Sequence, residues 1–328
     1  MLAACYERTG AAAEVLRVVD LPDPVPGPGE VGVRLRWSGI NPTDVKSRSG
    51  ARGPQMPFAR VVPHSDGMGV IDAVGPGVTE SRLGERVWLW NAAWGRACGT
   101  AAQRIALPAE QAVPLPEAAS DEAGACLGIP AMTALHALLT DGGVAGKRVL
   151  VAGGGGAVGH YAVQFARLLG ARQVLATAST PAKQRLAAEA GAAAVVDYRD
   201  ADAAQRLRDA TGGEGVDRIV EVDLAANAAL DLAVMRPGAL WVAYGNGGRQ
   251  FTLPFFPMIS AHVLLRLFIV FRLDAAERAR AHALLAGWLG QGALRHHVAS
   301  NFDLASVAQA HDAVESGRAG ARVLLRLP

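Results

Sequence analysis

The apolar positions divide the chain into two regions with different periodicity. In residues 1–120, short runs that alternate apolar and polar residues are separated by proline and glycine clusters, a pattern typical of β-strands. The predicted strands are Ala3–Tyr6, Glu14–Val19, Gly32–Trp37, Gly69–Val74, Arg86–Leu89 and Arg104–Leu107. The proline-rich segment 22–29 is incompatible with a helix or a central strand. This region is therefore expected to form a small barrel or sandwich.

From about residue 121, apolar strands alternate with helices. A helix is predicted over Glu122–Leu139, broken near its middle by Gly128 and Pro130. Further strands are predicted at Arg148–Ala152, Gln173–Ala178, Ala194–Asp197, Asp217–Val222, Ala239–Tyr244 and Leu264–Phe271, and helices at Val158–Leu169, Pro181–Ala190, Ala201–Ala210, Ala226–Met235 and Ala275–Gly290. The tail is predicted to form strand, helix and strand at Val298–Phe302, Leu304–Glu315 and Arg322–Leu327. Continuous apolar strands alternating with helices indicate a parallel sheet covered on both faces.

Composition and charge exclude several function classes. The 328 residues correspond to two domains at roughly 150 residues per domain. The 32 basic and 30 acidic residues nearly cancel, so we expect no nucleic-acid partner. Two uncharged stretches, Val149–Ala166 and Phe251–Leu265, contain glycines or prolines, and we expect neither to span a membrane. Three widely spaced cysteines are too few for a disulfide framework, and a cytoplasmic location is expected.

The most specific local motif is a glycine-rich turn between a predicted strand and a predicted helix. Gly154-x-Gly156-x-x-Gly159 fits the dinucleotide-binding fingerprint in the required context. Such a turn lets the backbone approach a pyrophosphate, and the helix N-terminus presents N–H groups to its oxygens. The residues expected to bind the cofactor here are Gly154, Gly156, Ala157, Val158 and Gly159.

The strand that follows this helix is not followed by an acid. A site that prefers NAD usually has an acidic residue there to accept from the ribose 2′-hydroxyl. This chain has Ser179, which can donate to a 2′-phosphate, and Lys183, which adds positive charge. Alternatively, Ser179 only caps the next helix and Lys183 is a solvated surface residue. The missing acid favours NADPH as the cofactor.

Further segments fit one known family. They are Gly39–Asp44, Ser65–Gly75, Gly84–Val87, Gly128–Ala134, Asp197–Arg199 and Gly212–Asp217, in addition to the glycine-rich turn. In these residues the chain resembles the zinc-free quinone oxidoreductase (zeta-crystallin-like) branch of the medium-chain dehydrogenase/reductase superfamily. The resemblance implies an α/β fold in which a Rossmann domain with a doubly wound parallel sheet is inserted into a GroES-like β-rich catalytic domain. The expected boundaries are 1–121 and 274–328 for the GroES-like part and 122–273 for the Rossmann domain.

The resemblance also indicates which residues occupy the metal positions. Zinc alcohol dehydrogenases of the superfamily hold their catalytic metal with two cysteines and a histidine, where this chain has Asn41, Ser65 and Ile129. Isoleucine cannot coordinate a metal, and neutral amide and hydroxyl oxygens are poor zinc ligands. We therefore expect no metal and no alcohol oxidation, because that reaction needs a Lewis acid.

The remaining site residues are implied by matching positions. Candidate catalytic residues are Asn41, which matches a residue beside the nicotinamide, Asp66, and His64, a possible proton donor. Cofactor contacts are expected from Thr133, Tyr198, Gly245, Asn246, Val270 and Phe271, and substrate contacts from Asn41, Lys46 and Trp94. Alternatively, Asn41 forms a turn, Thr133 packs a helix, His64 is a packing group and Asp66 bonds nearby backbone.

These observations predict an NADPH-dependent quinone oxidoreductase that transfers hydride to a quinone in the cleft between its domains. One alternative is an NADPH-dependent enoyl or 2-alkenal reductase, which acts on an activated alkene and must deliver a proton to carbon. Another is a redox-sensing or lens-type protein that binds NADPH without useful turnover. The apolar run Leu264–Phe271 is expected to be an edge strand through which a homodimer forms.

Overall fold

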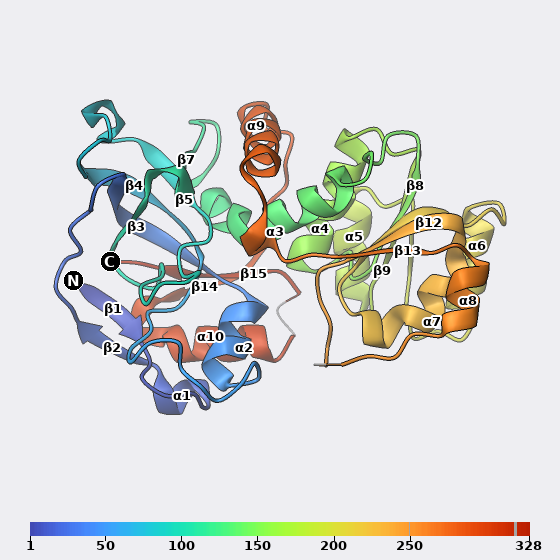
Figure 1. Cartoon of the computed structure of the whole chain (residues 1–328), viewed down its shortest axis with the longest axis horizontal. Helices are drawn as coiled ribbons and strands as arrows, with labels where there is room; N and C mark the ends of the chain where they lie inside the picture. The colour runs from blue at the N-terminus through green and yellow to red at the C-terminus, as the bar shows by residue number, and fades with distance from the viewer. Residues whose placement is uncertain (249, 318–319) are drawn as a thin grey trace. The chain divides into compact units, whose positions relative to one another are not determined.

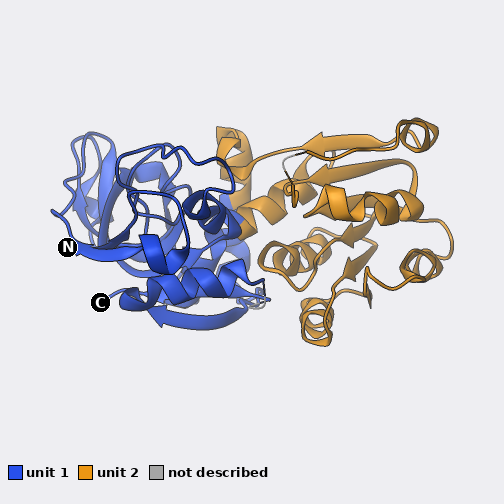
Figure 2. Cartoon of the chain, turned by 90° about the horizontal axis from the view of Figure 1, so that it is seen from below, with its two compact units in different colours: residues 1–129, 282–328 blue, residues 130–281 orange. Residues whose placement is uncertain are grey.

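The computed structural model describes residues 1–248, 250–317 and 320–328 (Figure 1). The chain forms two compact units, residues 1–129 with 282–328 (unit 1) and residues 130–281 (unit 2), which Figure 2 shows in different colours. Both boundaries lie inside long helices, α3 (Asp121–Leu139) and α9 (Ala275–Gly290). They fall later than the expected boundaries at 121 and 273, because each helix continues beyond the point where the composition changes.

Unit 1 is built on a mixed sheet, antiparallel except for the parallel pair β14–β15, that is completed by the end of the chain. The central strand β3 (Glu30–Ile40) pairs with β4 (Asp66–Val74), β6 (Arg104–Pro108) and the C-terminal β15 (Arg322–Arg326). The remaining strands of this sheet are β5 (Arg86–Leu89), β7 (Ala112–Pro114) and β14 (Val298–Asp303), and β1 (Leu2–Cys5) and β2 (Arg17–Asp20) form a separate pair. The tail therefore returns to the first domain, as expected.

The helices and one strand of unit 1 differ in several places from the elements predicted from the sequence. Part of the predicted strand Glu14–Val19 is instead the helix α1 (Ala12–Val15), because Ala12 and Val15 are buried three residues apart on one helical face. The sequence pattern also did not predict α2 (Pro42–Ser49) or β7. The predicted C-terminal helix is α10 (Val307–Glu315), preceded by the 3₁₀ turn η4 (Leu304–Ser306); two further 3₁₀ turns are η1 (Glu80–Arg82) and η2 (Ala109–Gln111).

Unit 2 contains a six-stranded parallel sheet in the order β10-β9-β8-β11-β12-β13. The strands are β8 (Arg148–Val151), β9 (Gln173–Thr177), β10 (Ala194–Val196), β11 (Val216–Glu221), β12 (Met235–Ala243) and β13 (Leu264–Leu267). The helices are α4 (Ala157–Leu168), α5 (Pro181–Ala190), α6 (Ala203–Ala210), α7 (Leu224–Val234) and α8 (Phe255–Ser260), with the 3₁₀ turn η3 (Val270–Arg272). This strand order, which turns back on itself beside β8, is that of a Rossmann sheet.

The last strand is shorter than predicted. The run Leu264–Phe271 forms β13 only as far as Leu267, and Val270 begins the turn η3. Phe268 N still donates to Ala243 O, at 3.2 Å, after which the chain leaves the sheet. The strand does lie at the edge of the sheet, paired only with β12.

Helix α3 passes through the predicted break without interruption. It spans 19 residues with Pro130 inside it. Among the described residues, α3 is the one helix that is long and apolar enough to cross a bilayer, with a mean hydropathy of 1.3. The search for uncharged stretches in the sequence did not select it. Since 83% of that window is buried inside the protein, its environment is that of a core helix.

Candidate functional site

The glycine-rich turn between β8 and α4 shows which glycines the protein itself requires. A Cβ on Gly154 would lie 2.6 Å from the Cβ of Ala176, and one on Gly159 would lie 2.1 Å from the carbonyl oxygen of Gly153. A Cβ on Gly156 would meet only Gly153 O, at 3.3 Å. Internal packing therefore demands Gly154 and Gly159, whereas Gly156 borders open space, which fits the close approach of a ligand pyrophosphate.

The N-terminus of α4 is suited to bind an anion. Gly156 is its N-cap, and no side chain caps the helix. The N–H groups of Ala157 and Val158 belong to the first turn, where the helix offers them no carbonyl partner. Gly153 N donates to Thr177 Oγ1 at 3.2 Å, and Gly154 N donates to Thr177 O at 2.9 Å. Thr177, which the sequence analysis did not select, thus anchors the turn on β9.

Ser179 and Lys183 lie beside this turn. Thr180, rather than Ser179, caps α5, because its Oγ1 accepts from Lys183 N at 3.3 Å. The alternative of Ser179 as a helix cap is thereby excluded. A Cβ on Gly155 would be 2.4 Å from the carbonyl oxygen of Lys183, so the first turn of α5 packs directly on the glycine-rich turn. The structure therefore places the backbone of Lys183 against the glycine-rich turn, and Ser179 lies just before α5 in the chain.

Tyr198 belongs to the turn after β10, the strand next to β9 in the sheet. Its side chain is exposed. The adjacent Arg199 donates from Nη2 to the carbonyl oxygen of Ser179, which joins the two turns. Arg199 was not among the candidate residues, although the Asp197–Arg199 segment contributed to the family resemblance.

The other candidate cofactor residues occupy different parts of unit 2. A Cβ on Gly245 would be 2.2 Å from Val222 O, so the loop after β12 lies against the end of β11. Asn246 Oδ1 accepts from Ala225 N at 2.9 Å and so holds the start of α7. The remaining three are Thr133, buried on α3, Val270, buried in η3, and the half-buried Phe271.

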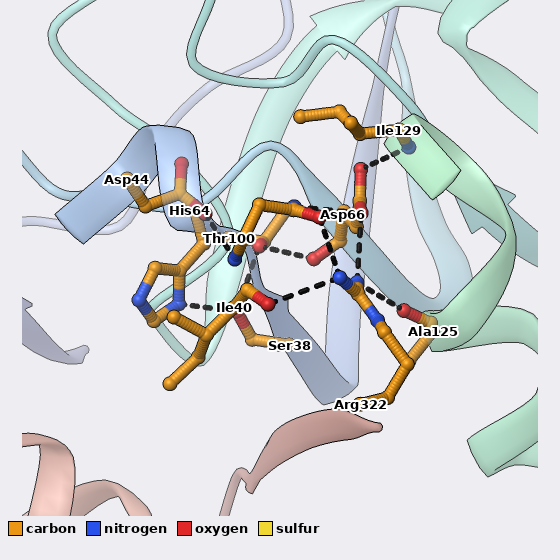
Figure 3. Close-up of polar contacts among 10 residues, drawn as sticks. Ser38, Ile40, Asp44, His64, Asp66, Thr100, Ala125, Ile129 and Arg322 are labelled. Atoms are coloured by element: carbon orange, nitrogen blue, oxygen red, sulfur yellow. Dashed lines mark hydrogen bonds and ion pairs between the residues drawn. The ribbon is translucent and has the colours of Figure 1, made fainter. Parts of the chain in front are cut away.

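In unit 1, Asn41 belongs to a buried polar cluster with Asp66 and Arg322, both of which are labelled in Figure 3. Asn41 Nδ2 donates to Asp66 Oδ2 at 2.8 Å, and Asn41 Oδ1 accepts from Arg322 Nη1 at 2.5 Å. Arg322 Nη2 also donates to Asp66 Oδ2, at 2.7 Å. The three side chains are between 0% and 3% exposed. Arg322 was missed by the sequence analysis; the available signal was an arginine that opens segment 322–327, in which Arg326 is the only other residue that is not apolar.

Two glycines make room for this cluster. A Cβ on Gly39 would lie 2.1 Å from Arg322 Nη2, and one on Gly128 would lie 2.1 Å from Asp66 Oδ1. Gly128 therefore admits Asp66 to the surface of α3 rather than breaking the helix. Beside it, Ile129 N donates to Asp66 Oδ1 at 2.8 Å, and Arg322 Nη2 donates to Ala125 O at 3.1 Å.

Burial changes the electrostatics of the two acids near Asn41. Desolvation raises the pKa of Asp66, while Arg322 and the hydrogen bonds oppose that rise by stabilising its charge. Desolvation also raises the pKa of Asp44 to about 7. Asp44 Oδ2 accepts from Asn41 N at 2.8 Å, completing a capping box at the start of α2. This box fixes the backbone of Asn41, whereas Asp66 and Arg322 fix its side chain.

A chain of hydrogen bonds leads from Asp66 to His64. Thr100 Oγ1 donates to the carbonyl oxygen of Asp66 at 2.6 Å. Having used its hydrogen there, Thr100 accepts from Ser38 Oγ at 2.8 Å, and Ser38 in turn accepts from His64 Nδ1 at 2.8 Å. His64 Nε2 lies 2.9 Å from His311 Nε2, and because burial lowers the pKa of both rings they are neutral. His311 therefore donates this last hydrogen bond.

These contacts correct the expectation that His64 donates a proton to substrate. Its ring is fully buried, its Nδ1–H is used by Ser38, and its Nε2 accepts from His311. The side chain has no hydrogen left to transfer. The packing role, which was the alternative, is the one the structure supports.

The three matched metal positions carry no ligand set. Asn41 is engaged by Arg322 and Asp66, Ser65 is buried, and Ile129 contributes its backbone N–H to Asp66. Within the described ranges, no group of three or more His, Cys, Asp or Glu residues is placed to hold a metal ion.

Of the three candidate substrate residues, Lys46 and Trp94 are accessible, whereas Asn41 is buried. Lys46 is exposed on α2. Trp94 is 41% exposed. It lies in a tight turn, in which Trp94 N donates a hydrogen bond to Asn91 O at 3.1 Å. Its indole therefore has surface available to a flat ligand.

Comparison with known proteins shows which families and solved structures this chain resembles. Residues 27–117 match the alcohol dehydrogenase GroES-like domain, and residues 157–286 match the zinc-binding dehydrogenase family. The chain is 32% identical to a quinone oxidoreductase of Homo sapiens over 319 residues, covering 95% of this chain and 94% of that protein. A solved NAD-dependent alcohol dehydrogenase is 29% identical with a TM-score of 0.90, and each chain is covered completely. A mycobacterial protein solved with NADPH is 30% identical with a TM-score of 0.88, covering 99% of this chain and 100% of that one.

Proposed function

The chain belongs to the medium-chain dehydrogenase/reductase superfamily, and from that premise we propose that it is a cytoplasmic, NADPH-dependent quinone oxidoreductase that works without a metal ion. The relatives named quinone oxidoreductase and the similar structure with NADPH support this assignment. Three free cysteines, one of them the exposed Cys98, fit a reducing compartment.

The observation that carries the proposal is the buried pair of Arg322 and Asp66. The pair bonds to two of the three matched metal positions, the side chain of Asn41 and the backbone N–H of Ile129, and the guanidinium donates to the oxygen atoms of Asp66 and Asn41. A dication placed beside this guanidinium would be repelled by its charge. The acceptor must then take hydride without Lewis-acid assistance, and quinones meet that requirement because the hydroquinone anion is stabilised by resonance.

The residues of unit 2 fit a dinucleotide with a 2′-phosphate. The turn Gly154–Gly159 and the first turn of α4 would hold the pyrophosphate, and Ser179, Lys183 and Tyr198 would hold the 2′-phosphate. Thr133, Gly245, Asn246, Val270 and Phe271 are proposed to hold the nicotinamide end. Bound NADPH would supply the hydride. No carboxylate lies between the end of β9 and Lys183, which removes the usual partner of an NAD ribose.

On the substrate side, Asn41 is proposed to orient the reactants, with Asp66 and Arg322 holding its amide. Its amide retains one Nδ2 hydrogen beyond the bonds described, whereas Oδ1 accepts both from Arg322 Nη1 and, in the capping box, from Asp44 N. Lys46 and Trp94 are proposed to contact the acceptor. Since His64 has no proton to give, the hydroquinone anion is protonated by water, whereas an enoyl reductase would need a donor aimed at carbon.

An acceptor screen that follows NADPH absorbance tests the proposal. We expect 1,4-naphthoquinone to be reduced at least about tenfold faster than a crotonyl thioester or a 2-alkenal, as expected if no group delivers a proton to carbon. Preference for the alkenes would replace this proposal with the enoyl or alkenal reductase. NADPH binding without oxidation by any acceptor would instead indicate a binding protein.

A further inference from the structure

Arg199 joins two neighbouring turns at the carboxyl edge of the unit 2 sheet. Its Nη2 donates to the carbonyl oxygen of Ser179, beyond the end of β9. Its Nε donates to Asp197 Oδ1 at 2.9 Å and its Nη2 to Asp197 Oδ2 at 2.6 Å, beyond the end of β10. The backbone N of Arg199 also donates to Asp197 Oδ1, at 3.0 Å. The guanidinium is thus fixed against a carboxylate while it holds the turn that carries Ser179.

The fixed guanidinium has donors to spare. The described bonds engage Nε and Nη2, and the Arg199 side chain is 60% exposed. The Nη1 amino group carries two further N–H donors. Arginine presents such donors in a planar fork that suits phosphate oxygens.

The charges around Ser179 explain why Arg199 matters. Hydrogen bonds from Arg199 lower the pKa of Asp197 to about 2, so this carboxylate is ionised at neutral pH. Alone, its charge would repel a phosphate beside Ser179. Arg199 neutralises it, and the next acid along, Asp200, is paired with Arg206 at 3.0 Å. The first turn of α5, which carries Lys183, contains no acidic residue.

We propose that Arg199 is a specificity-determining residue for the 2′-phosphate of NADPH. It positions the turn that presents Ser179, neutralises Asp197, and offers Nη1 donors to the phosphate. This inference rests on the proposed NADPH preference. It adds Arg199 to the residues that determine this preference, beyond the glycine-rich turn, Ser179 and Lys183.

The test compares Arg199→Gln and Arg199→Lys with the control Arg185→Gln, which removes another exposed arginine, on α5, that has no part in the pairs described. Dissociation constants for NADPH and NADH are measured by fluorescence titration, and for 2′,5′-ADP and 5′-AMP by displacement. For Arg199→Gln we expect the dissociation constant of NADPH to rise about tenfold or more, because a charge-assisted contact with the 2′-phosphate is lost. The dissociation constant of NADH should change less than about twofold, because NADH has no 2′-phosphate. Arg199→Lys should recover part of the preference, and Arg185→Gln should keep all of it.

The outcomes separate this inference from the cofactor proposal. Equal constants for NADPH and NADH in the unchanged protein would overturn the cofactor proposal, and with it the role of Arg199. A preference for NADPH that survives in Arg199→Gln would overturn the role of Arg199 alone. So would equal weakening of NADPH and NADH, or of 2′,5′-ADP and 5′-AMP, because that result would mean that Arg199 only supports the fold. Retained NADH binding shows that the variant is folded.

Discussion

Arg322 and Asp66 form an ion pair across 2.7 Å, with side chains only 3% and 0% exposed. Each is the first residue of its strand, β15 and β4, and they are 256 positions apart in the chain. The same guanidinium donates to Ile40 O at 3.0 Å and Ala125 O at 3.1 Å. One side chain thereby ties the tail of the chain to β3, β4 and α3 within unit 1.

Removing one partner of this pair should be costly. Arg322→Met leaves the Asp66 charge buried without compensation, and we expect the free energy of unfolding to fall by about 3–5 kcal/mol. Urea unfolding followed by tryptophan fluorescence measures it, since five of the six tryptophans belong to unit 1. The double variant Arg322→Met/Asp66→Asn should lose less than the single variant, because no unpaired charge remains. A single variant within about 1 kcal/mol of the parent would contradict this view of the pair.

Asn41 and His64 should differ in their effect on turnover. Asn41→Ala removes the amide that is proposed to orient the reactants, and we expect kcat for quinone reduction to fall at least about tenfold, or 1.4 kcal/mol. His64→Gln should keep kcat within about threefold, because His64 has no transferable proton. Steady-state kinetics with naphthoquinone checks both, with circular dichroism as the control for folding. If His64→Gln is the more damaging change, a side chain does deliver the proton.

Activity should not depend on a metal ion. We expect protein treated exhaustively with EDTA or dipicolinate to retain its quinone reductase rate, because Asn41, Ser65 and Ile129 replace the metal ligands. Metal analysis of the treated protein is the control. Loss of activity that added zinc restores would disprove a metal-free mechanism.

The His64–His311 pair should make unit 1 sensitive to acid. Burial lowers the pKa of both rings, that of His311 to about 3. A lowered pKa means that the unfolded chain binds more protons below pH 6.5, so stability is full above that pH and is lost as the pH falls towards 3. The full loss from His311 is on the order of 5 kcal/mol. Urea midpoints at pH 7 and pH 5 should differ less in His311→Gln than in the parent, whereas the exposed control His297→Gln should behave as the parent does.

The edge strand β13 is expected to mediate a homodimer. Leu264 and Leu267 are each 58% exposed on a strand whose outer edge is unpaired within the described chain. Pairing with a second copy would cover them and continue the sheet. Light scattering should give the mass of a dimer for the parent and of a monomer for Leu264→Lys/Leu267→Lys, with Leu83→Lys, at another exposed leucine, as the control. A monomeric parent at micromolar concentration would rule the dimer out.

The family, the two-part fold and the cofactor region were all accessible from the sequence. Alternating strands and helices predict the parallel sheet, because periodicity records which side of each element is apolar. Spacing along the sequence is enough to select the turn Gly154–Gly159 and the residues Ser179 and Lys183, because each lies within a few residues of the end of a strand. Such features depend on short-range geometry, and in the structure the first turn of α5 packs on the glycine-rich turn.

Only the tertiary structure decided which polar side chains share the interior of unit 1. Arg322 meets Asp66, and His311 meets His64, across more than 240 positions of sequence. No local pattern predicts either pairing, because a single arginine or histidine in an apolar segment has the same spacing whether it is buried or solvated. The same long-range contacts explain Gly128 and the unbroken helix α3, whose backbone at Ala125 and Ile129 bonds to Arg322 and Asp66. The role of His64 changed for this reason: a buried ring is defined by its partners, and those partners come from distant parts of the chain.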